Sequence, residues 1–300
     1  MSPKKNPRNA RPKRPKSRAS NLSAPAEKQS VGPIALLARK ELKMFLVLTF
    51  LFSLVGYWLF IHMTPDNTLL PTMALMWSPA LSALITRLYY QRDLKGMGFG
   101  IGQIKWQAAS MLLPIVLGLL IFGSVWLVFG AFNAQNALVV FSLSYLPIFA
   151  VLLAYSVFCA AGEEIGWRGL LVPETAKIMP FWPMALITGC IWAAWHVPII
   201  VFGNYHGTGP LWYSLATILP SIVGCGIILA WLRLESGSVW TGVLFHGFWN
   251  YFIQGFYPAI TVNTPTTLLI TGEFGLVAPL LYILAVALMW KYRAKLIPKE

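Results

Sequence analysis

Eight long apolar runs limit what this chain of 300 residues can fold into. Each is close to the roughly 20 residues that an α-helix needs to cross the hydrocarbon core of a bilayer. The runs are 44–62, 69–90, 107–132, 137–160, 182–203, 211–232, 238–257 and 274–291. Only 11% of the residues are charged, against about 25% in a soluble domain. The sequence therefore predicts an all-α, polytopic membrane helix bundle of about eight transmembrane helices.

The basic residues predict how this bundle is oriented in the membrane. If the N-terminus is cytosolic, all 23 Lys and Arg residues fall on the cytosolic side, in 1–43, 87–105, 168–177, 233 and 291–299. The opposite loops contain none, and these loops are 63–68, 133–136, 204–210 and 258–273. Because positively charged loops stay in the cytosol, we expect a multi-pass protein of the cell membrane with both termini cytosolic.

The N-terminal segment is expected to differ from the rest of the chain. Residues 1–32 are rich in Lys, Arg, Pro and Ser, so we expect a disordered basic cytosolic tail before a transmembrane domain over 33–300. It lacks the pattern of a signal peptide. Its charge favours loose contact with anionic headgroups, so the lipid bilayer is an expected partner and nucleic acid is not. The cysteines are interpreted as buried hydrophobes without a disulfide, namely Cys159, Cys190 and Cys225.

The strongest functional signal is the doubled acid Glu163-Glu164 at the end of the fourth run. One ionised acid at mid-membrane costs about 2.5–3.5 kcal/mol even on lenient insertion scales. Glu164 and Arg168 have the spacing and order of a helical ion pair, so we interpret them as structural and Glu163 as the acid left for chemistry. The alternative is that both acids cap a helix end near the cytosol. Gly162 and Gly166 form a small-xxx-small step, which predicts the close approach of another backbone.

Two histidines lie inside apolar runs. His196 follows Trp192 by one turn, and His246 precedes Asn250 by one turn on the same face. A lone intramembrane histidine is usually a packing residue, but two on separate helices together with the doubled acid favour a shared polar site. His196 would lie about 20 Å into its helix and His246 about 12 Å. A tilt or a late helix start is needed to bring them level.

These groups supply the parts of water-mediated amide hydrolysis. Glu163 can take a proton from water and later return it, and His196 can orient the same water. His246 and Asn250 can donate hydrogen bonds to a developing oxyanion. We therefore predict four catalytic residues, namely Glu163, His196, His246 and Asn250. Three further residues are predicted to support them, namely Glu164, Arg168 and Trp192.

The cofactor is left open. Glu163, His196 and His246 match the donor set of a catalytic zinc site, but the sequence contains no HExxH motif. We favour Glu163 acting on water directly with no cofactor, and we keep a divalent metal such as zinc, bound by these three residues, as the alternative.

The order of the three motifs resembles that of the CPBP family. This family comprises the type II CAAX prenyl endopeptidases and the bacteriocin-processing or immunity proteins, also called Abi proteins. Its pattern is EExxxR, FxxxH and HxxxN or a close variant, and here the motifs run over 163–168, 192–196 and 246–250. Trp192 replaces the usual Phe. The resemblance covers about 145–255, and the text Glu-Glu-Ile-Gly-Trp-Arg-Gly is typical of bacterial members.

The resemblance implies an intramembrane protease. Glu163 and His196 would activate water, while His246 and Asn250 would form the oxyanion site. The family is often labelled metalloprotease, although some members look like glutamate-dependent enzymes without a metal.

We expect an intramembrane endopeptidase that cuts near the cytosolic face. Eukaryotic relatives remove the last three residues of prenylated CAAX proteins, but here we favour a peptide precursor or small membrane protein as the substrate. A non-catalytic immunity or scaffold protein of the same fold is the first alternative. A proton-coupled transporter is the second, and it predicts internal repeats that we do not find in the sequence. No oligomeric state is predicted.

Overall fold

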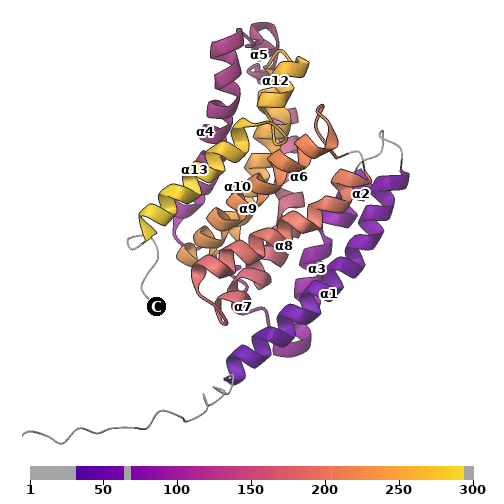
Figure 1. Ribbon diagram of the computed structural model, residues 1–300, viewed down its shortest axis with the longest axis vertical. Helices are drawn as coiled ribbons and strands as arrows, with labels where there is room; N and C mark the ends of the chain where they lie inside the picture. Colours follow the sequence, from indigo (N-terminus) through magenta and orange to yellow (C-terminus); the bar gives the residue numbers. More distant parts are fainter. Residues whose placement is uncertain (1–31, 64–68, 204, 294–300) are drawn as a thin grey trace, which may run out of the picture. The chain divides into compact units, whose positions relative to one another are not determined.

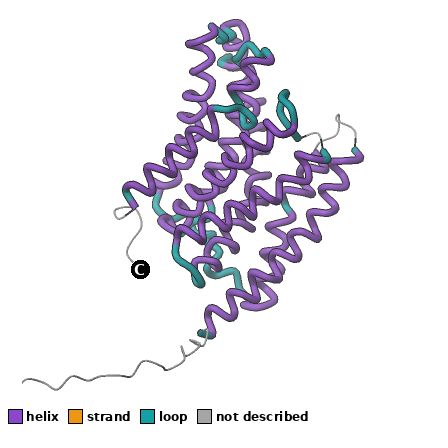
Figure 2. The backbone as a smooth tube through the Cα atoms, viewed as in Figure 1, coloured by secondary structure: helices purple, strands orange, loops and turns teal. Residues whose placement is uncertain are grey.

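The computed structural model describes residues 32–63, 69–203 and 205–293. Within these ranges the chain is helical and has no strand, apart from one isolated antiparallel bridge between Phe132 and Thr261. Figures 1 and 2 show the resulting all-α arrangement. The predicted helical membrane bundle is thereby confirmed, whereas the predicted basic tail, except for Gly32, lies outside the described residues.

The helices follow the apolar runs closely. They are α1 (Pro33–His62), α2 (Leu69–Met76), α3 (Ser78–Gln91), α4 (Ile104–Phe129), α5 (Ala134–Val140), the 3-10 turn η1 (Leu143–Tyr145), α6 (Leu146–Gly166), the π-helical turn η2 (Trp167–Leu171), α7 (Val172–Ala176), α8 (Phe181–Val201), α9 (Leu211–Ser236), α10 (Trp240–Tyr251), the π-helical turn η3 (Phe252–Phe256), α11 (Tyr257–Ala259), α12 (Pro265–Ile270) and α13 (Val277–Lys291).

Six helical segments of the described residues are long and apolar enough to cross a membrane. They are Pro33–His62, Leu69–Gln91, Ile104–Phe129, Leu143–Ala176, Phe181–Val201 and Leu211–Ser236. The last two predicted spans are not among these six, and α13 has only 15 residues. The predicted number of eight is therefore not confirmed.

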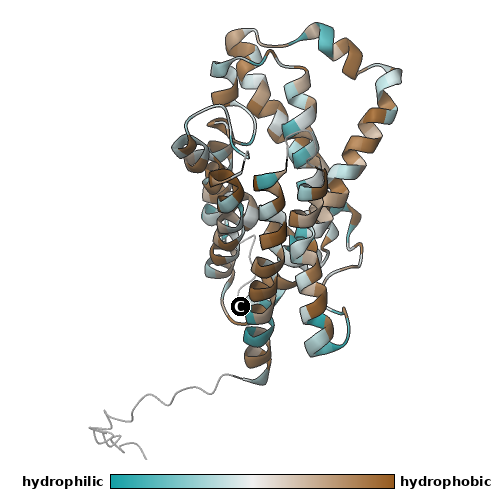
Figure 3. Cartoon of the chain, turned by 90° about the vertical axis from the view of Figure 1, so that its right-hand side faces the viewer, coloured by the Kyte–Doolittle hydropathy of each residue, from teal (hydrophilic) through white to brown (hydrophobic). Residues whose placement is uncertain are grey.

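Apolar side chains cover much of the outside of the bundle, as a lipid-facing surface requires. Figure 3 shows hydrophobic residues along the lengths of the helices. Cys190 lies on such an outward face of α8, beside exposed Leu186 and Ile187. The expectation that all three cysteines are buried is therefore wrong for Cys190, because it lies on the same side of its helix as these two residues. Cys159 and Cys225 are buried, as expected.

Helix α6 packs tightly against the end of α2 and the start of α3, and two glycines allow it. A Cβ atom added to Gly162 would lie 2.6 Å from the carbonyl oxygen of Met76, and one added to Gly166 would lie 2.4 Å from Cβ of Pro79. Real Cβ atoms do not approach so closely, so the predicted approach of another backbone is confirmed. Since these glycines flank the doubled acid, the packing holds Glu163 and Glu164 inside the bundle.

A second set of contacts fixes α8 against α1 and α3. The Tyr57 hydroxyl donates to the backbone carbonyl of Trp195 at 2.6 Å. The Trp195 indole donates to Oγ of Ser53 at 2.7 Å, and Ser53 is in turn bonded to Ser78 at 2.7 Å. These buried polar groups are satisfied within the protein, as the bilayer requires. They hold the backbone of α8 beside His196, while α10 packs on α6 and α4, and α9 on α8 (Figure 1).

Candidate active site

Glu163 is buried near the end of α6 and is held by two indoles. Its exposed fraction is 2%. Oε2 accepts a hydrogen bond from Nε1 of Trp192 at 2.7 Å and a longer one from Nε1 of Trp167 at 3.3 Å. Oε1 accepts no hydrogen bond from any residue that the structure describes. Two donors therefore orient the carboxylate and leave one oxygen for another partner.

Glu164 is fully buried and joins α6 to α10. Its Oε1 accepts from Nη1 of Arg168 at 2.9 Å, which confirms the predicted ion pair. The same oxygen lies 3.0 Å from Nδ1 of His246. The Arg168 guanidinium also lies over the Trp192 ring, 4.2 Å from its centroid. Gly242 gives the carboxylate room, because a Cβ there would lie 2.6 Å from Oε2.

The two histidines are oriented through their Nδ1 atoms. Nδ1 of His196 lies 2.9 Å from the backbone carbonyl of Trp192. A carbonyl only accepts, so this nitrogen carries the hydrogen and Nε2 of neutral His196 keeps a lone pair. Nδ1 of His246 faces the carboxylate of Glu164 and donates to it for the same reason. Both rings thus have Nε2 available for other partners, and in His196 that atom is an acceptor.

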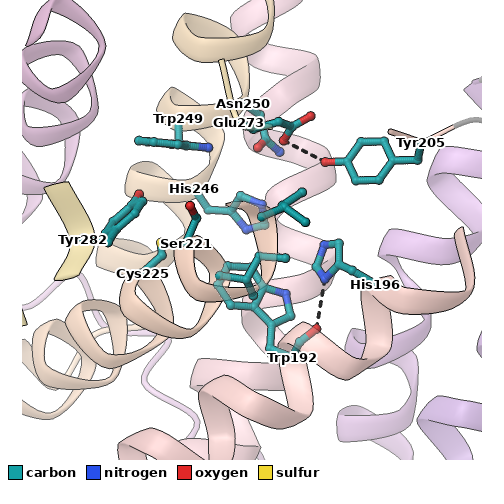
Figure 4. A pocket seen from close by; sticks show the side chains of 12 residues that line it. Trp192, His196, Tyr205, Ser221, Cys225, His246, Trp249, Asn250, Glu273 and Tyr282 are labelled. Atoms are coloured by element: carbon teal, nitrogen blue, oxygen red, sulfur yellow. Dashed lines mark hydrogen bonds between the residues drawn. The ribbon is translucent and has the colours of Figure 1, made fainter. Parts of the chain in front are cut away.

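One cavity brings together most of the predicted polar residues (Figure 4). Its volume is about 50 Å³, and a water molecule needs roughly 10–15 Å³ on this measure. The lining residues are Trp192, His196, Tyr205, Ile218, Ser221, Ile222, Cys225, His246, Trp249, Asn250, Glu273 and Tyr282. The two histidines therefore line the same cavity, despite the difference in depth expected from their positions along their helices. The space between them can hold water.

Glu163 is not among the residues that line this cavity. Trp192 connects the two, since its ring lines the cavity and its indole N–H donates to Glu163. The ring centroid of Trp192 lies 5.8 Å from that of His196 and 5.4 Å from that of His246. The structure thus brings three of the four predicted catalytic side chains to one cavity and places the fourth, Glu163, one hydrogen bond behind its wall.

The cavity also contains polar residues that the sequence analysis missed. Glu273 lies between α12 and α13, outside the candidate spans, and its Oε2 accepts from the Tyr205 hydroxyl at 2.8 Å and from Nε2 of Gln254 at 2.9 Å. Burial raises the pKa of Glu273 to about 7, and these two hydrogen bonds and His246 oppose the shift. The available signal was an acid directly before the apolar run 274–291, but spacing along the chain does not give the position of a loop residue in space.

Glu163, His196 and His246 are the residues proposed as metal ligands. Within the described ranges, no three His, Cys, Asp or Glu side chains are arranged to hold a metal ion. A metal bound by Glu163, His196 and His246 stays a prediction, and no step of the chemistry below uses it.

The central part of the chain is similar to known membrane proteases. Residues 144–252 match the family model described as type II CAAX prenyl endopeptidase Rce1-like. CAAX prenyl protease 2 of Methanococcus maripaludis is 28% identical over 143 residues, which are 46% of this chain and 49% of that protein. The chain thus spans about half the length of this curated relative. The match includes Glu163 through Asn250 and excludes Gln254 and Glu273, and it confirms the resemblance to the CPBP family.

Proposed function

We propose that this chain, which carries the Rce1-like region of the CPBP family over residues 144–252, is an intramembrane endopeptidase. Its substrate would be a peptide bond in a membrane-associated peptide or small membrane protein. The observation that carries the proposal is the cavity shared by His196, His246 and Asn250, with Glu163 held behind its wall by Trp192. Water and a carbonyl group are the reactants that this set of side chains suits.

Glu163 is the general base of the proposed reaction. For a water that lies between Glu163 and His196, Oε1 of Glu163 removes one proton, while the lone pair on Nε2 of His196 accepts a hydrogen bond from the remaining O–H and orients the molecule. The water oxygen attacks the carbonyl carbon, and the carbonyl electron pair moves to oxygen. His246 is protonated on both ring nitrogens beside the Glu164 carboxylate, so its Nε2 donates to this oxyanion together with the side-chain amide of Asn250. Glu163 then returns its proton to the leaving amine as the C–N bond breaks.

The charge distribution supports a cytosolic orientation for the Glu163 end of the site, while Tyr205 and Glu273 of the cavity belong to the loops 204–210 and 258–273, which carry no basic residue. Glu163, Glu164 and Arg168 lie towards the end of the Leu143–Ala176 segment that is followed by Lys177. Basic residues beside a span stay in the cytosol, so this end of the segment would face the cytosol. Both chain termini, which follow the same alternation, would be cytosolic as well.

Cleavage of a peptide library tests the proposed function. Purified protein in lipid vesicles is incubated with membrane-anchored peptides, half of them carrying a prenyl group, and the products are identified by mass spectrometry. We expect discrete fragments from the wild type. Loss of one oxyanion donor in His246→Ala should lower kcat about 10² to 10³-fold. Binding of peptides without any cleavage by the wild type would favour an immunity or scaffold role and overturn the proposal.

Trp192→Phe tests what the departure from the family pattern contributes. Phenylalanine keeps an aromatic wall beside both histidines but removes the indole donor to Glu163. A hydrogen bond to a charged group is worth about 1.5–3 kcal/mol, and Trp167 remains as a second donor, so we expect kcat/KM to fall about 10-fold. Trp212→Phe on the exposed surface is the matched control. An unchanged kcat/KM for Trp192→Phe would show that this indole does not orient the carboxylate.

A further inference from the structure

A chain of three polar side chains runs along one end of the cavity. Nε2 of Gln254 donates to Oε2 of Glu273 at 2.9 Å, and the same nitrogen lies 3.4 Å from Oδ1 of Asn250. Figure 4 shows Glu273 and Asn250 next to each other, with Tyr205 pointing at the carboxylate. We call Glu273, Gln254 and Asn250 the amide relay.

The carboxylate sets the direction of every hydrogen bond in the amide relay. An ionised carboxylate only accepts, so Gln254 must turn its NH₂ group towards Glu273. That NH₂ group then faces Asn250, which must offer its carbonyl oxygen. The remaining group of Asn250 is its own NH₂, a donor, and Asn250 lines the cavity. One acid at the end of the amide relay thereby determines whether Asn250 presents a donor to the cavity.

The backbone of this region is consistent with such a role. Gln254 belongs to the π-helical turn η3, which directly follows α10, and single π-helical turns are frequent at functional sites. Asn250 is in α10, while Glu273 comes from the loop before α13. The relay therefore joins a helix of the site to a loop that is distant in sequence.

We infer that Glu273 is a positioning residue of the active site, which acts through Gln254 to aim the Asn250 amide donor at the oxyanion. This inference rests on the proposed function. It assigns a role to two residues outside the matched family region. Glu273 contacts neither the water nor the reacting carbonyl in this scheme, so it affects the transition state only through the amide relay.

A double-mutant cycle tests the relay. Glu273→Leu and Gln254→Leu each free Asn250 to rotate, so each should lower kcat about 10 to 100-fold, at or below the roughly 10² to 10³-fold cost of losing a donor outright. KM should change little, because the donor acts in the transition state. The double variant should lose no more than either single variant, because both act through one path. Gln135→Leu, at an exposed position of α5, is the control.

The isosteric variant Glu273→Gln keeps the size of the side chain and provides a second measurement, the pH dependence of kcat. A protonated Glu273 can donate, which lets Gln254 and then Asn250 turn round. Because the pKa of Glu273 is about 7, the ratio of wild-type to Glu273→Gln kcat should rise with pH through this range. The titratable groups that line the cavity with Glu273 are Tyr205, His196, His246, Cys225 and Tyr282, and they are unchanged in this comparison.

Each result either supports or overturns the inference. Equal, non-additive losses of kcat and a pH-dependent ratio support it. If the wild type cleaves peptides and Glu163→Gln does not, while the relay variants keep wild-type kcat or lose it additively, only the inference fails. Should the Leu variants not fold, a ratio for Glu273→Gln that is constant with pH overturns it. Absence of cleavage by the wild type removes both the proposed function and the inference.

Discussion

Glu163→Gln is expected to lower kcat about 10² to 10⁴-fold, the contribution that a positioned general base makes. Glutamine has the same shape, and its carbonyl oxygen can still accept from the Trp192 indole. It cannot take a proton from water at neutral pH, so the attacking hydroxide is not generated. The measurement is the rate of fragment release from a membrane-anchored peptide in vesicles, at saturating substrate.

The control for this variant separates lost chemistry from lost folding. Glu235→Gln makes the same change at an exposed position of α9 and should keep the wild-type rate. Thermal unfolding of Glu163→Gln should follow the wild-type curve closely, since no cationic side chain in the described part of the chain forms an ion pair with this carboxylate. If a folded Glu163→Gln protein retains more than about one tenth of the wild-type kcat, Glu163 is not the base.

Arg168→Met is expected to cause the largest loss of stability. Arg168 is 2% exposed and is one of the two residues that pair with the buried Glu164. Breaking a buried pair from one side costs about 3–5 kcal/mol, because the remaining charge is uncompensated. The guanidinium also contacts the Trp192 ring, and a desolvated cation–π contact adds about 2 kcal/mol. Unfolding in mixed micelles, followed by tryptophan fluorescence, measures the change in the free energy of unfolding.

A second substitution identifies the cause of that loss. In Glu164→Gln/Arg168→Met the buried negative charge of Glu164 is absent as well, so the double variant should be more stable than Arg168→Met alone. Arg39→Met, which removes an exposed charge from α1, should change the free energy of unfolding by less than about 1 kcal/mol. A loss from Arg168→Met as small as that of the control would mean that Arg168 is not needed to neutralise Glu164.

The helices are the part of the fold that the sequence predicts best. The run 211–232 became α9 (Leu211–Ser236), and 69–90 became α2 and α3, which end at Gln91. A span must satisfy its backbone hydrogen bonds internally and match the thickness of the hydrocarbon. Both requirements act locally, so they can be read from the length of an apolar run. The seventh predicted span is not among the candidate membrane spans of the described residues, although α10, η3 and α11 follow one another without a break.

Side-chain contacts within one helix were also predictable. Glu164 and Arg168 are four residues apart, and helix geometry brings that spacing to one face. Gly162 and Gly166 likewise indicated a close approach, although the spacing did not identify α3 as the partner. The third contact of this region, between Glu164 and His246, joins residues 82 positions apart and has no counterpart in any local pattern.

The amide relay and the placement of Glu163 depended on how distant segments pack. Residue spacing specified which side chains share a helix face, because the helical repeat is constant along the chain. It did not specify which faces meet, since that follows from the shapes of many side chains on helices far apart in sequence. Glu163 consequently lies outside the lining of the cavity, hydrogen-bonded to the Trp192 indole, and Glu273 reaches the cavity from a loop. Both facts required the folded chain.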